Sequence, residues 1–450
     1  MRDRSAGDRR LPVRASGSPV ARPDPRPFYE TTVSRRDFAA LDRDVECDVC
    51  VVGAGYAGLS AALHLAESGE DVVLLESDRV GAGASGRNGG QVLPGYAAGI
   101  GQIRAAVGEE HAAALWRLGT EAVALVEELA ARPTIGCDFR HGHLTAAVRQ
   151  RHLRALDETA RNLAERYGYR SLRLLDGIEV SALVASRRYV GGLLDERAGH
   201  LNPLRFALGL AGAAAAGGVR LHERSPVLAI GGSWRGGRRV LRTPAGEVRA
   251  RRLVLTAGAR SETLASSLAA AALPATTFMI ATAPLGPARA KALIRRGIAV
   301  ADTNFVLDYY RLSADGRLLF GGGLRHAPPP PRRVADLLRR KMLRVFPQLA
   351  DVAVEHAWAG TIDVTGNYLP HVGRFDPSTW FAHGFSGHGV ALATLTGKLL
   401  AEAIAGRSER FDLLADAPRP RQRFPHGRAL RLPLVALGAL WYRARDALGG

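Results

Sequence analysis

DVCVVGAGYAGLSAALHLAESGEDVVLLESDRVGAGASGRNGGQ, residues 48–91, carries the strongest structural signal in the chain. An apolar run at Val49–Val52 leads into Gly53-Ala54-Gly55-Tyr56-Ala57-Gly58, which has the GxGxxG spacing. Apolar residues at helical spacing follow, and a second apolar run, Val72–Leu75, ends at Glu76. A strand, a glycine turn, a helix, a second strand and an acid in this order predict a dinucleotide-binding unit.

The residue types of this turn suit a dinucleotide. The first glycine permits the tight turn, the second lets backbone amides approach a pyrophosphate, and the third lets the helix pack close to the strand. The helix start faces the phosphates with its partial positive charge, and the acid accepts hydrogen bonds from the adenosine ribose. A purely structural glycine turn is the alternative interpretation. The predicted cofactor contacts are Gly53, Gly55, Tyr56, Ala57, Gly58 and Glu76.

A second glycine-rich segment, Gly81–Gln91, comes next. Five glycines in eleven residues, with polar side chains among them, make a flexible backbone that is rich in donors. Such a loop suits a second phosphate and the edge of a flavin ring, whereas an ordinary surface loop is the alternative. The predicted contacts here are Ala84, Ser85, Arg87, Asn88, Gly89, Gly90 and Gln91.

Two later segments favour FAD over a nicotinamide cofactor. Phe385–Val390 opens an apolar helix, and the free amides of that helix start suit the negative charge of a reduced isoalloxazine. Leu253–Gly258 is an apolar strand that ends in a small-residue turn. Nicotinamide enzymes need neither segment, so we expect FAD, with no covalent link assigned to a cysteine. The predicted contacts are Ala257, Gly258, Gly387, His388, Gly389 and Val390.

These motifs resemble those of the FAD-dependent amino-acid and amine oxidase superfamily, which includes D-amino-acid, glycine and sarcosine oxidases. Within it, Leu307–Gly323, His383–Ile404 and the tail from Phe424 are similar to bacterial gamma-glutamylputrescine oxidases. The sequence departs from that pattern at Ala54 and over Gly360–Gly373. The resemblance also implies that Val227 contacts the adenine through its backbone.

The order of elements predicts an α/β fold with a discontinuous, Rossmann-like FAD-binding domain and an α+β substrate domain that contains an antiparallel sheet. The FAD-binding domain is expected over residues 45–95, 201–270 and 357–406, and the substrate domain over residues 96–200 and 271–356. Residues 1–44 are expected to form a partly disordered arm. Residues 407–450 are expected to form a basic tail with a short apolar helix at Leu432–Tyr442.

The formal charge of +18 comes from 61 Lys and Arg residues against 43 Asp and Glu residues. Only three of the 61 are Lys, and no basic helix is interleaved with stacking aromatics, so we expect no nucleic-acid partner. The apolar part of the tail suits either a membrane surface or its own protein. Three cysteines and the lack of an apolar leader predict a cytoplasmic protein, and no metal site is expected.

Three residues are candidates for catalysis or substrate binding. His388, at the start of the late helix, suits either flavin charge stabilisation and oxygen activation or a structural hydrogen bond to the backbone. Strand alternation places Tyr309 and Arg311 on one face. That pair suits a substrate carboxylate, whereas a solvated strand face is the alternative.

The resemblance implies an FAD-dependent oxidoreductase that oxidises the C–N bond of a small amine. Gamma-glutamylputrescine or a related polyamine is the expected substrate, and oxygen is the expected acceptor, giving an imine or aldehyde and hydrogen peroxide. A dehydrogenase that passes electrons to a quinone or carrier, with the basic tail at the membrane, is the first alternative. An RNA-associated flavoprotein is a more distant one.

Overall fold

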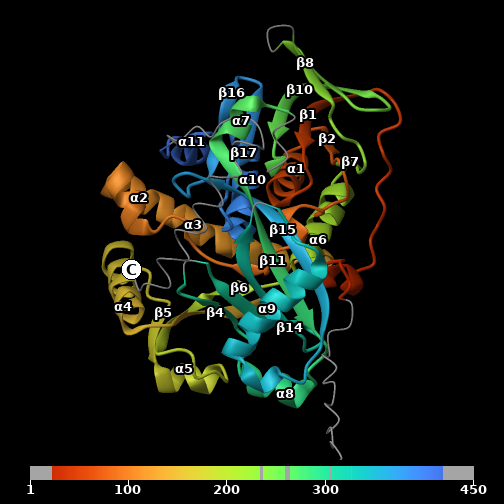
Figure 1. The fold of residues 1–450 in the computed structure, drawn as a ribbon. Coiled ribbons are helices and arrows are strands. Elements are labelled where there is room, and N and C mark those ends of the chain that lie inside the picture. Colours follow the sequence, from red (N-terminus) through yellow and green to blue (C-terminus); the bar gives the residue numbers. More distant parts are fainter. Residues whose placement is uncertain (1–22, 234–236, 259–263, 305, 326, 419–450) are drawn as a thin grey trace, which may run out of the picture.

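The computed structural model describes residues 23–233, 237–258, 264–304, 306–325 and 327–418 (Figure 1). The expected apolar helix at Leu432–Tyr442 lies outside this range, as does the first half of the expected N-terminal arm. In the second half, the short 3-10 helix η1 (Phe28–Thr32) buries Phe28 and Tyr29. No helix in the described part of the chain is long and apolar enough to cross a membrane.

The first sheet has the parallel core of a dinucleotide-binding fold. Its main path runs β16-β17-β10-β1-β2-β7, and the β8–β9 hairpin extends from β10. Neighbours from β17 to β7 pair in parallel, and β16 adds an antiparallel edge. Its strands are β1 (Val45–Val52), β2 (Val72–Leu75), β7 (Arg220–His222), β8 (Ala229–Ser233), β9 (Arg238–Arg242), β10 (Glu247–Leu255), β16 (His371–Asp376) and β17 (Thr379–His383).

The second sheet, in the lower part of Figure 1, is largely antiparallel, which confirms the expected fold class. Its path runs β15-β11-β14-β13-β12-β4-β6-β3, with β5 paired to β6. Among the described strands of this second sheet, only β12 and β4 pair in parallel. Its strands are β3 (Gln91–Val92), β4 (Arg140–Ala147), β5 (Leu172–Asp176), β6 (Gly191–His200), β11 (Ala272–Thr282), β12 (Ala299–Asp302), β13 (Asp308–Leu312), β14 (Leu318–Arg325) and β15 (Val354–Thr365).

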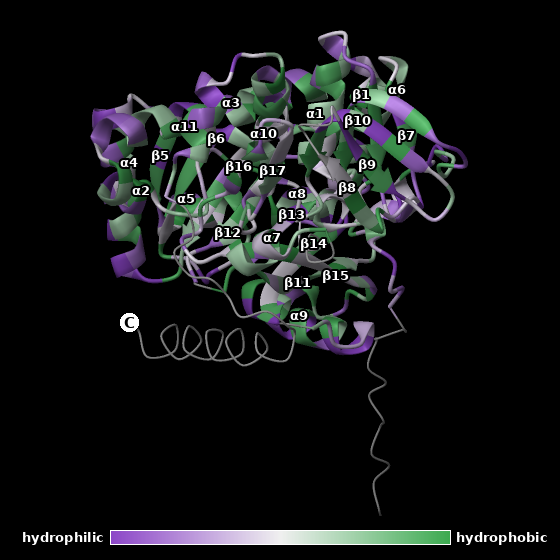
Figure 2. Ribbon diagram, turned by 90° about the horizontal axis from the view of Figure 1, so that it is seen from above, coloured by the Kyte–Doolittle hydropathy of each residue, from purple (hydrophilic) through white to green (hydrophobic). Residues whose placement is uncertain are grey.

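Helices cover both sheets, and the long ones near the first sheet are apolar on several sides. By contrast, the outer helix α4 is largely hydrophilic in Figure 2 and buries only Leu163. The α-helices are α1 (Tyr56–Glu67), α2 (Ile100–Val107), α3 (Glu109–Ala130), α4 (Gln150–Tyr167), α5 (Gly177–Leu183), α6 (Pro203–Ala216), α7 (Ser266–Ala271), α8 (Pro287–Leu293), α9 (Pro331–Val345), α10 (Gly389–Ile404) and α11 (Glu409–Ala415). Short 3-10 helices are η2 (Ala84–Gly86), η3 (Pro133–Ile135) and η6 (Pro347–Leu349).

Two of the expected domain boundaries need correction. β3 follows the Gly81–Gln91 loop directly and pairs with β6 in the second sheet, so the first segment changes sheets before residue 95. β15 contains residue 357, and it pairs with β11 from Val354 to Thr365. Apolar alternation predicts a strand but does not tell which sheet the strand joins, because that depends on a partner far away in the sequence.

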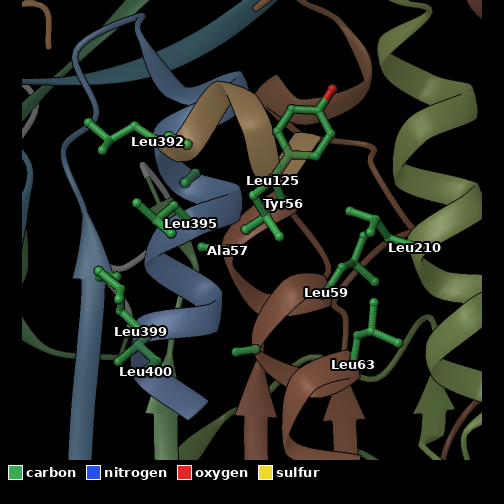
Figure 3. Close-up of a cluster of buried hydrophobic side chains, with 14 of the residues drawn as sticks. Tyr56, Ala57, Leu59, Leu63, Leu125, Leu210, Leu392, Leu395, Leu399 and Leu400 are labelled. Carbon is green, nitrogen blue, oxygen red and sulfur yellow. The ribbon is translucent and has the colours of Figure 1, made fainter. Parts of the chain in front are cut away.

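Helix α1 is the centre of the main core, where it packs between α6 and α10 (Figure 3). Leu59 and Leu63 lie towards α6, while Leu395 and Leu399 of α10 lie on the opposite side in the figure. The two helices approach closely because α10 has a glycine at the contact. A Cβ on Gly397 would overlap the carbonyl oxygen of Ala57.

We predict that Gly397→Ala lowers the free energy of unfolding, because overpacking of this kind costs about 1–3 kcal/mol. Gly212→Ala in α6 is the matched control, since a Cβ there would meet nothing within 4 Å. The control should gain about 0.5–1 kcal/mol from helix propensity. Urea unfolding of both variants checks this, and equal shifts would contradict the close α1–α10 contact.

Candidate cofactor and active site

The turn between β1 and α1 has the backbone that a pyrophosphate site needs. Gly53 has a φ of 107°, which favours glycine, and a Cβ there would lie 2.8 Å from the carbonyl oxygen of Thr256. A Cβ on Gly58 would overlap the carbonyl oxygen of Gly53. Gly55 is the N-cap of α1 and provides no side-chain cap, so the N–H groups of Ala57 and Gly58 in the first turn remain available to an anion.

Three segments meet around this turn as the sequence predicts. Thr256 donates its hydroxyl to the carbonyl oxygen of Val52 at 2.9 Å, which places the following Ala257 and Gly258 beside Gly53. From the second glycine-rich loop, the Ser85 hydroxyl accepts the N–H of Tyr56 at 3.1 Å. The loop that follows β2 therefore folds back over the start of α1.

Glu76 lies at the end of β2, in the position expected for a ribose-binding acid. Its carboxylate accepts the N–H of Ala54 at 2.8 Å and the N–H of Asp78 at 2.9 Å. Its carbonyl oxygen accepts the N–H of Ser225 at 2.8 Å, which brings the segment before Val227 next to it. Val227 is partly buried against the cluster that includes the ends of β1, β2 and β10.

The loop from Ala84 to Gln91 joins the first sheet to the second. The Asn88 side-chain amide donates to the carbonyl oxygens of Ala84 and Ser85, both at 3.0 Å, and closes the loop on itself. Arg87 donates to Ala82, and Gln91 donates to Val300 of β12. The loop is thus an ordered structure and not a solvated surface turn.

Tyr309 and Arg311 of β13 lie against this loop. The Nε of Arg311 donates to the carbonyl oxygen of Gly89 at 2.6 Å, and a Cβ on Gly89 would lie 2.9 Å from the Tyr309 ring. Arg311 is only 5% exposed, so the solvated strand face is wrong for this residue. Strand alternation correctly placed the pair on one face, since the intervening Tyr310 bonds instead to Tyr189.

Helix α10 begins at Gly389 and points its first turn towards the same region. Ser386 and Gly387 have φ values of 53° and 85°, and they turn the chain sharply into the helix. The Nε2 of His388, the N-cap residue, lies 3.1 Å from the carbonyl oxygen of Pro94. Burial lowers the pKa of His388, although hydrogen bonds to the backbone partly oppose the shift. His388 therefore makes the backbone contact that a structural role predicts.

Two buried histidines, His143 on β4 and His200 on β6, were not predicted. Burial is the main cause that lowers the pKa of His143 to about 4 and that of His200 to about 3, with a further contribution to the latter from Arg311. The Nε2 of His143 and the Nδ1 of His200 have no hydrogen-bond partner among the described residues. Both side chains are therefore neutral at pH 7 and retain unused polar atoms. Neither residue belongs to a local motif, so the sequence offered no signal.

An Asp–His–His chain was also missed. Nδ1 of His371 lies 2.8 Å from Nε2 of His383, whose Nδ1 lies 3.4 Å from a carboxylate oxygen of Asp363. That carboxylate also accepts the N–H of Gly384 at 2.6 Å. Burial opposes ionisation of Asp363, but the bonds from His383 and Gly384 outweigh it and lower the pKa. The chain links β15, β16 and β17 just before α10 and falls partly within the divergent Gly360–Gly373 segment.

The residues in these segments fit FAD. A glycine turn that tolerates no Cβ leads into the free amides of Ala57 and Gly58, an acid follows β2, and a second glycine loop lies between the two sheets. Together they form the donor-rich cradle that a dinucleotide requires. Three free, buried cysteines and no cluster of metal ligands occur in the described part of the chain.

The chain belongs to the FAD-dependent oxidoreductase family, whose sequence profile matches residues 48–403. Its cofactor is FAD. The gamma-glutamylputrescine oxidoreductase of Escherichia coli is 42% identical over 94% of this chain and 98% of its own length. The probable oxidoreductase OrdL of Haemophilus influenzae is 40% identical over 93% and 96%. The glycine oxidase of Geobacillus kaustophilus has the same fold, with a TM-score of 0.68 at 21% identity over 82% of this chain and 96% of its own.

We predict that His143 makes the protein sensitive to acid. Its pKa of about 4 in the folded protein is below the ordinary value of about 6.5. Between these two pH values the unfolded state therefore binds more protons than the folded state. Above pH 6.5 His143 causes no loss of stability. As the pH drops below 6.5, this residue lowers the free energy of unfolding, by about 2 kcal/mol at pH 5. His143→Gln should remove that part of the loss in urea unfolding at pH 7.5 and pH 5.

His141→Gln is the control, because His141 lies two residues earlier on the same strand and is exposed. It should change the pH dependence much less. If both variants kept the full acid sensitivity of the natural protein, His143 would not be the buried neutral group described here.

Proposed function

We propose that this protein oxidises the C–N bond of an amine that also carries a carboxylate, with gamma-glutamylputrescine or a related gamma-glutamylated polyamine as substrate. The observation that supports this most is that the cation of Arg311 is buried beside the 84–91 loop, where it bonds to Gly89. No described carboxylate lies within ion-pair distance of Arg311, His143 or His200. The similarity to the E. coli gamma-glutamylputrescine oxidoreductase supports the same choice.

The charges of this region favour such a substrate. Arg311 is a fixed cation, because a guanidinium stays protonated in proteins. A nearby cation disfavours an ammonium group and favours a carboxylate. The substrate amine is then held in its neutral form, from which hydride can leave, and the gamma-glutamyl carboxylate faces the guanidinium. Tyr309, on the same face of β13, offers a phenolic hydroxyl to the same carboxylate.

FAD, when bound, takes a hydride equivalent from the carbon that bears the amine. The chain itself orients that carbon with β13, stabilises negative charge with the amides at the start of α10, and keeps bulk water out. The resulting imine hydrolyses in water to an aldehyde. We propose oxygen as the final acceptor, with hydrogen peroxide as product. Transfer to a quinone or carrier is the alternative, and it differs in giving no peroxide.

The proposal is tested by mixing the yellow holoenzyme anaerobically with single amines and then admitting air. The panel is gamma-glutamylputrescine, putrescine, sarcosine, glycine and a D-amino acid. We expect gamma-glutamylputrescine to bleach the flavin fastest and air to restore it with peroxide. Fast bleaching by sarcosine or glycine alone would reject the substrate, and slow reoxidation without peroxide would reject oxygen as acceptor.

Arg311→Lys tests the carboxylate contact. We expect kcat/KM for gamma-glutamylputrescine to fall about 10- to 100-fold, as for loss of a charge-assisted, two-pronged contact. The value for putrescine, which has no carboxylate, should fall much less. The ratio of the two values cancels any difference in FAD content. Arg161→Lys on α4, an exposed position, is the control. An unchanged ratio in Arg311→Lys would reject the contact.

A further inference from the structure

Four consecutive carbonyl groups of the 84–91 loop are held by donors from outside the loop. Residues 87–90 each accept a hydrogen bond from a different donor, and the donors come from four separate parts of the chain. The Nε1 of Trp358 donates to the carbonyl of Arg87 at 2.9 Å, and the hydroxyl of Tyr29 donates to that of Asn88 at 2.8 Å. The Nε of Arg311 donates to the carbonyl of Gly89 at 2.6 Å, and the N–H of Leu201 donates to that of Gly90 at 2.8 Å.

The direction of these carbonyls fixes the direction of the amides. In a trans peptide, the N–H of one residue points opposite to the carbonyl of the residue before it, and no cis peptide occurs in the described residues. The N–H groups of Asn88 and Gly89 therefore point away from Trp358 and Tyr29. Neither N–H has a hydrogen-bond partner among the described residues. They are free donors on the side of the loop that faces away from Trp358 and Tyr29.

The outside donors hold the peptides of this loop together with the Asn88 side chain, which bonds to Ala84, Ser85 and the N–H of Gly90. Asn88 is followed by two glycines, and glycine peptides reorient easily because both signs of φ are accessible. Rotation of the Asn88–Gly89 peptide would put the Asn88 carbonyl oxygen where the Gly89 N–H now lies, and so replace a donor by an acceptor. The hydroxyl of Tyr29 is the donor that holds this peptide.

Tyr29 reaches the loop from a segment that precedes the first strand. The backbone of Asp24 pairs with β15, where its N–H donates to Glu355 and its carbonyl oxygen accepts from Ala357. The Tyr29 ring is fully buried, lies edge-on to Trp358 at 5.5 Å, and has the Arg311 guanidinium 5.8 Å from its centre. The N-terminal segment is therefore built into the second sheet beside the loop.

We propose that Tyr29 is a positioning residue for FAD, and that residues 24–32 act as a clasp that keeps the Asn88 and Gly89 amides turned towards the cofactor. The clasp acts through the Asn88 carbonyl and touches no substrate. The inference rests on FAD as cofactor and not on the identity of the amine. It assigns a cofactor role to a part of the chain that lies outside every dinucleotide motif.

Tyr29→Phe tests the clasp, because it keeps the ring contacts and removes only the hydroxyl, which donates to the Asn88 carbonyl at 2.8 Å and accepts from the Arg311 guanidinium at 3.4 Å. Tyr96→Phe is the matched control, since Tyr96 is also buried and donates to a backbone carbonyl, that of Leu115, at 2.9 Å. The measurements are the dissociation constant of FAD, from flavin fluorescence after dilution of each holoenzyme, and the melting temperature of each protein without FAD.

We expect both variants to lower the melting temperature of the FAD-free protein by similar amounts. Only Tyr29→Phe should raise the FAD dissociation constant, by roughly tenfold, as for one unmade buried hydrogen bond. It should also shift the visible absorption bands of the bound flavin. An unchanged dissociation constant and spectrum in Tyr29→Phe would overturn the clasp, and so would equal weakening of FAD binding in both variants.

Two shortened chains give a second test. Removal of residues 1–22 leaves the clasp intact and should leave FAD binding unchanged, whereas removal of residues 1–32 should weaken it at least as much as Tyr29→Phe. At saturating FAD, Tyr29→Phe should keep the same order of preference among amines. A changed order would show that Tyr29 acts on substrate binding and would overturn its role as a positioning residue for FAD alone.

Discussion

The packing of Gly58 against the carbonyl oxygen of Gly53 is the constraint on which the rest of the site depends. No side chain larger than hydrogen fits there, so the start of α1 lies directly on the end of β1. Because β1 pairs with both β2 and β10, this contact also sets where Glu76 and the Thr256 turn lie. Helix α10 is placed in turn by Gly397, which packs on Ala57 of α1.

The loop of residues 84–91 connects that rigid unit to the second sheet. On one side Ser85 accepts the N–H of Tyr56, and on the other Arg311 and Tyr29 hold the loop carbonyls. The cofactor cradle is therefore shared between the two sheets. Arg311 both holds the Gly89 carbonyl of the 84–91 loop and supplies a positive charge beside it. It is buried without a carboxylate partner among the described residues.

The sequence predicted the parts of the site that local backbone geometry determines. The GxGxxG turn, the acid at Glu76 and the start of α10 each follow from residue types at fixed spacing, and the parallel and antiparallel sheets followed from the order of elements. Tyr29, His143 and His200 are single buried residues on segments far from the glycine motifs in the sequence, so no spacing marked them. The sheet of β15 was assigned wrongly for the same reason, since its partner β11 is about 80 residues away along the chain.

The free amides of α1 and of the 84–91 loop are proposed to hold FAD between the two sheets, and a crystal structure of the holoenzyme is the sharpest test. We expect pyrophosphate oxygens to accept from the N–H groups of Ala57 and Gly58. We also expect the flavin to accept from the Asn88 or Gly89 N–H while the Tyr29 hydroxyl still bonds to the Asn88 carbonyl. A pyrophosphate bound elsewhere, or an Asn88 carbonyl turned inward to the flavin, would contradict it.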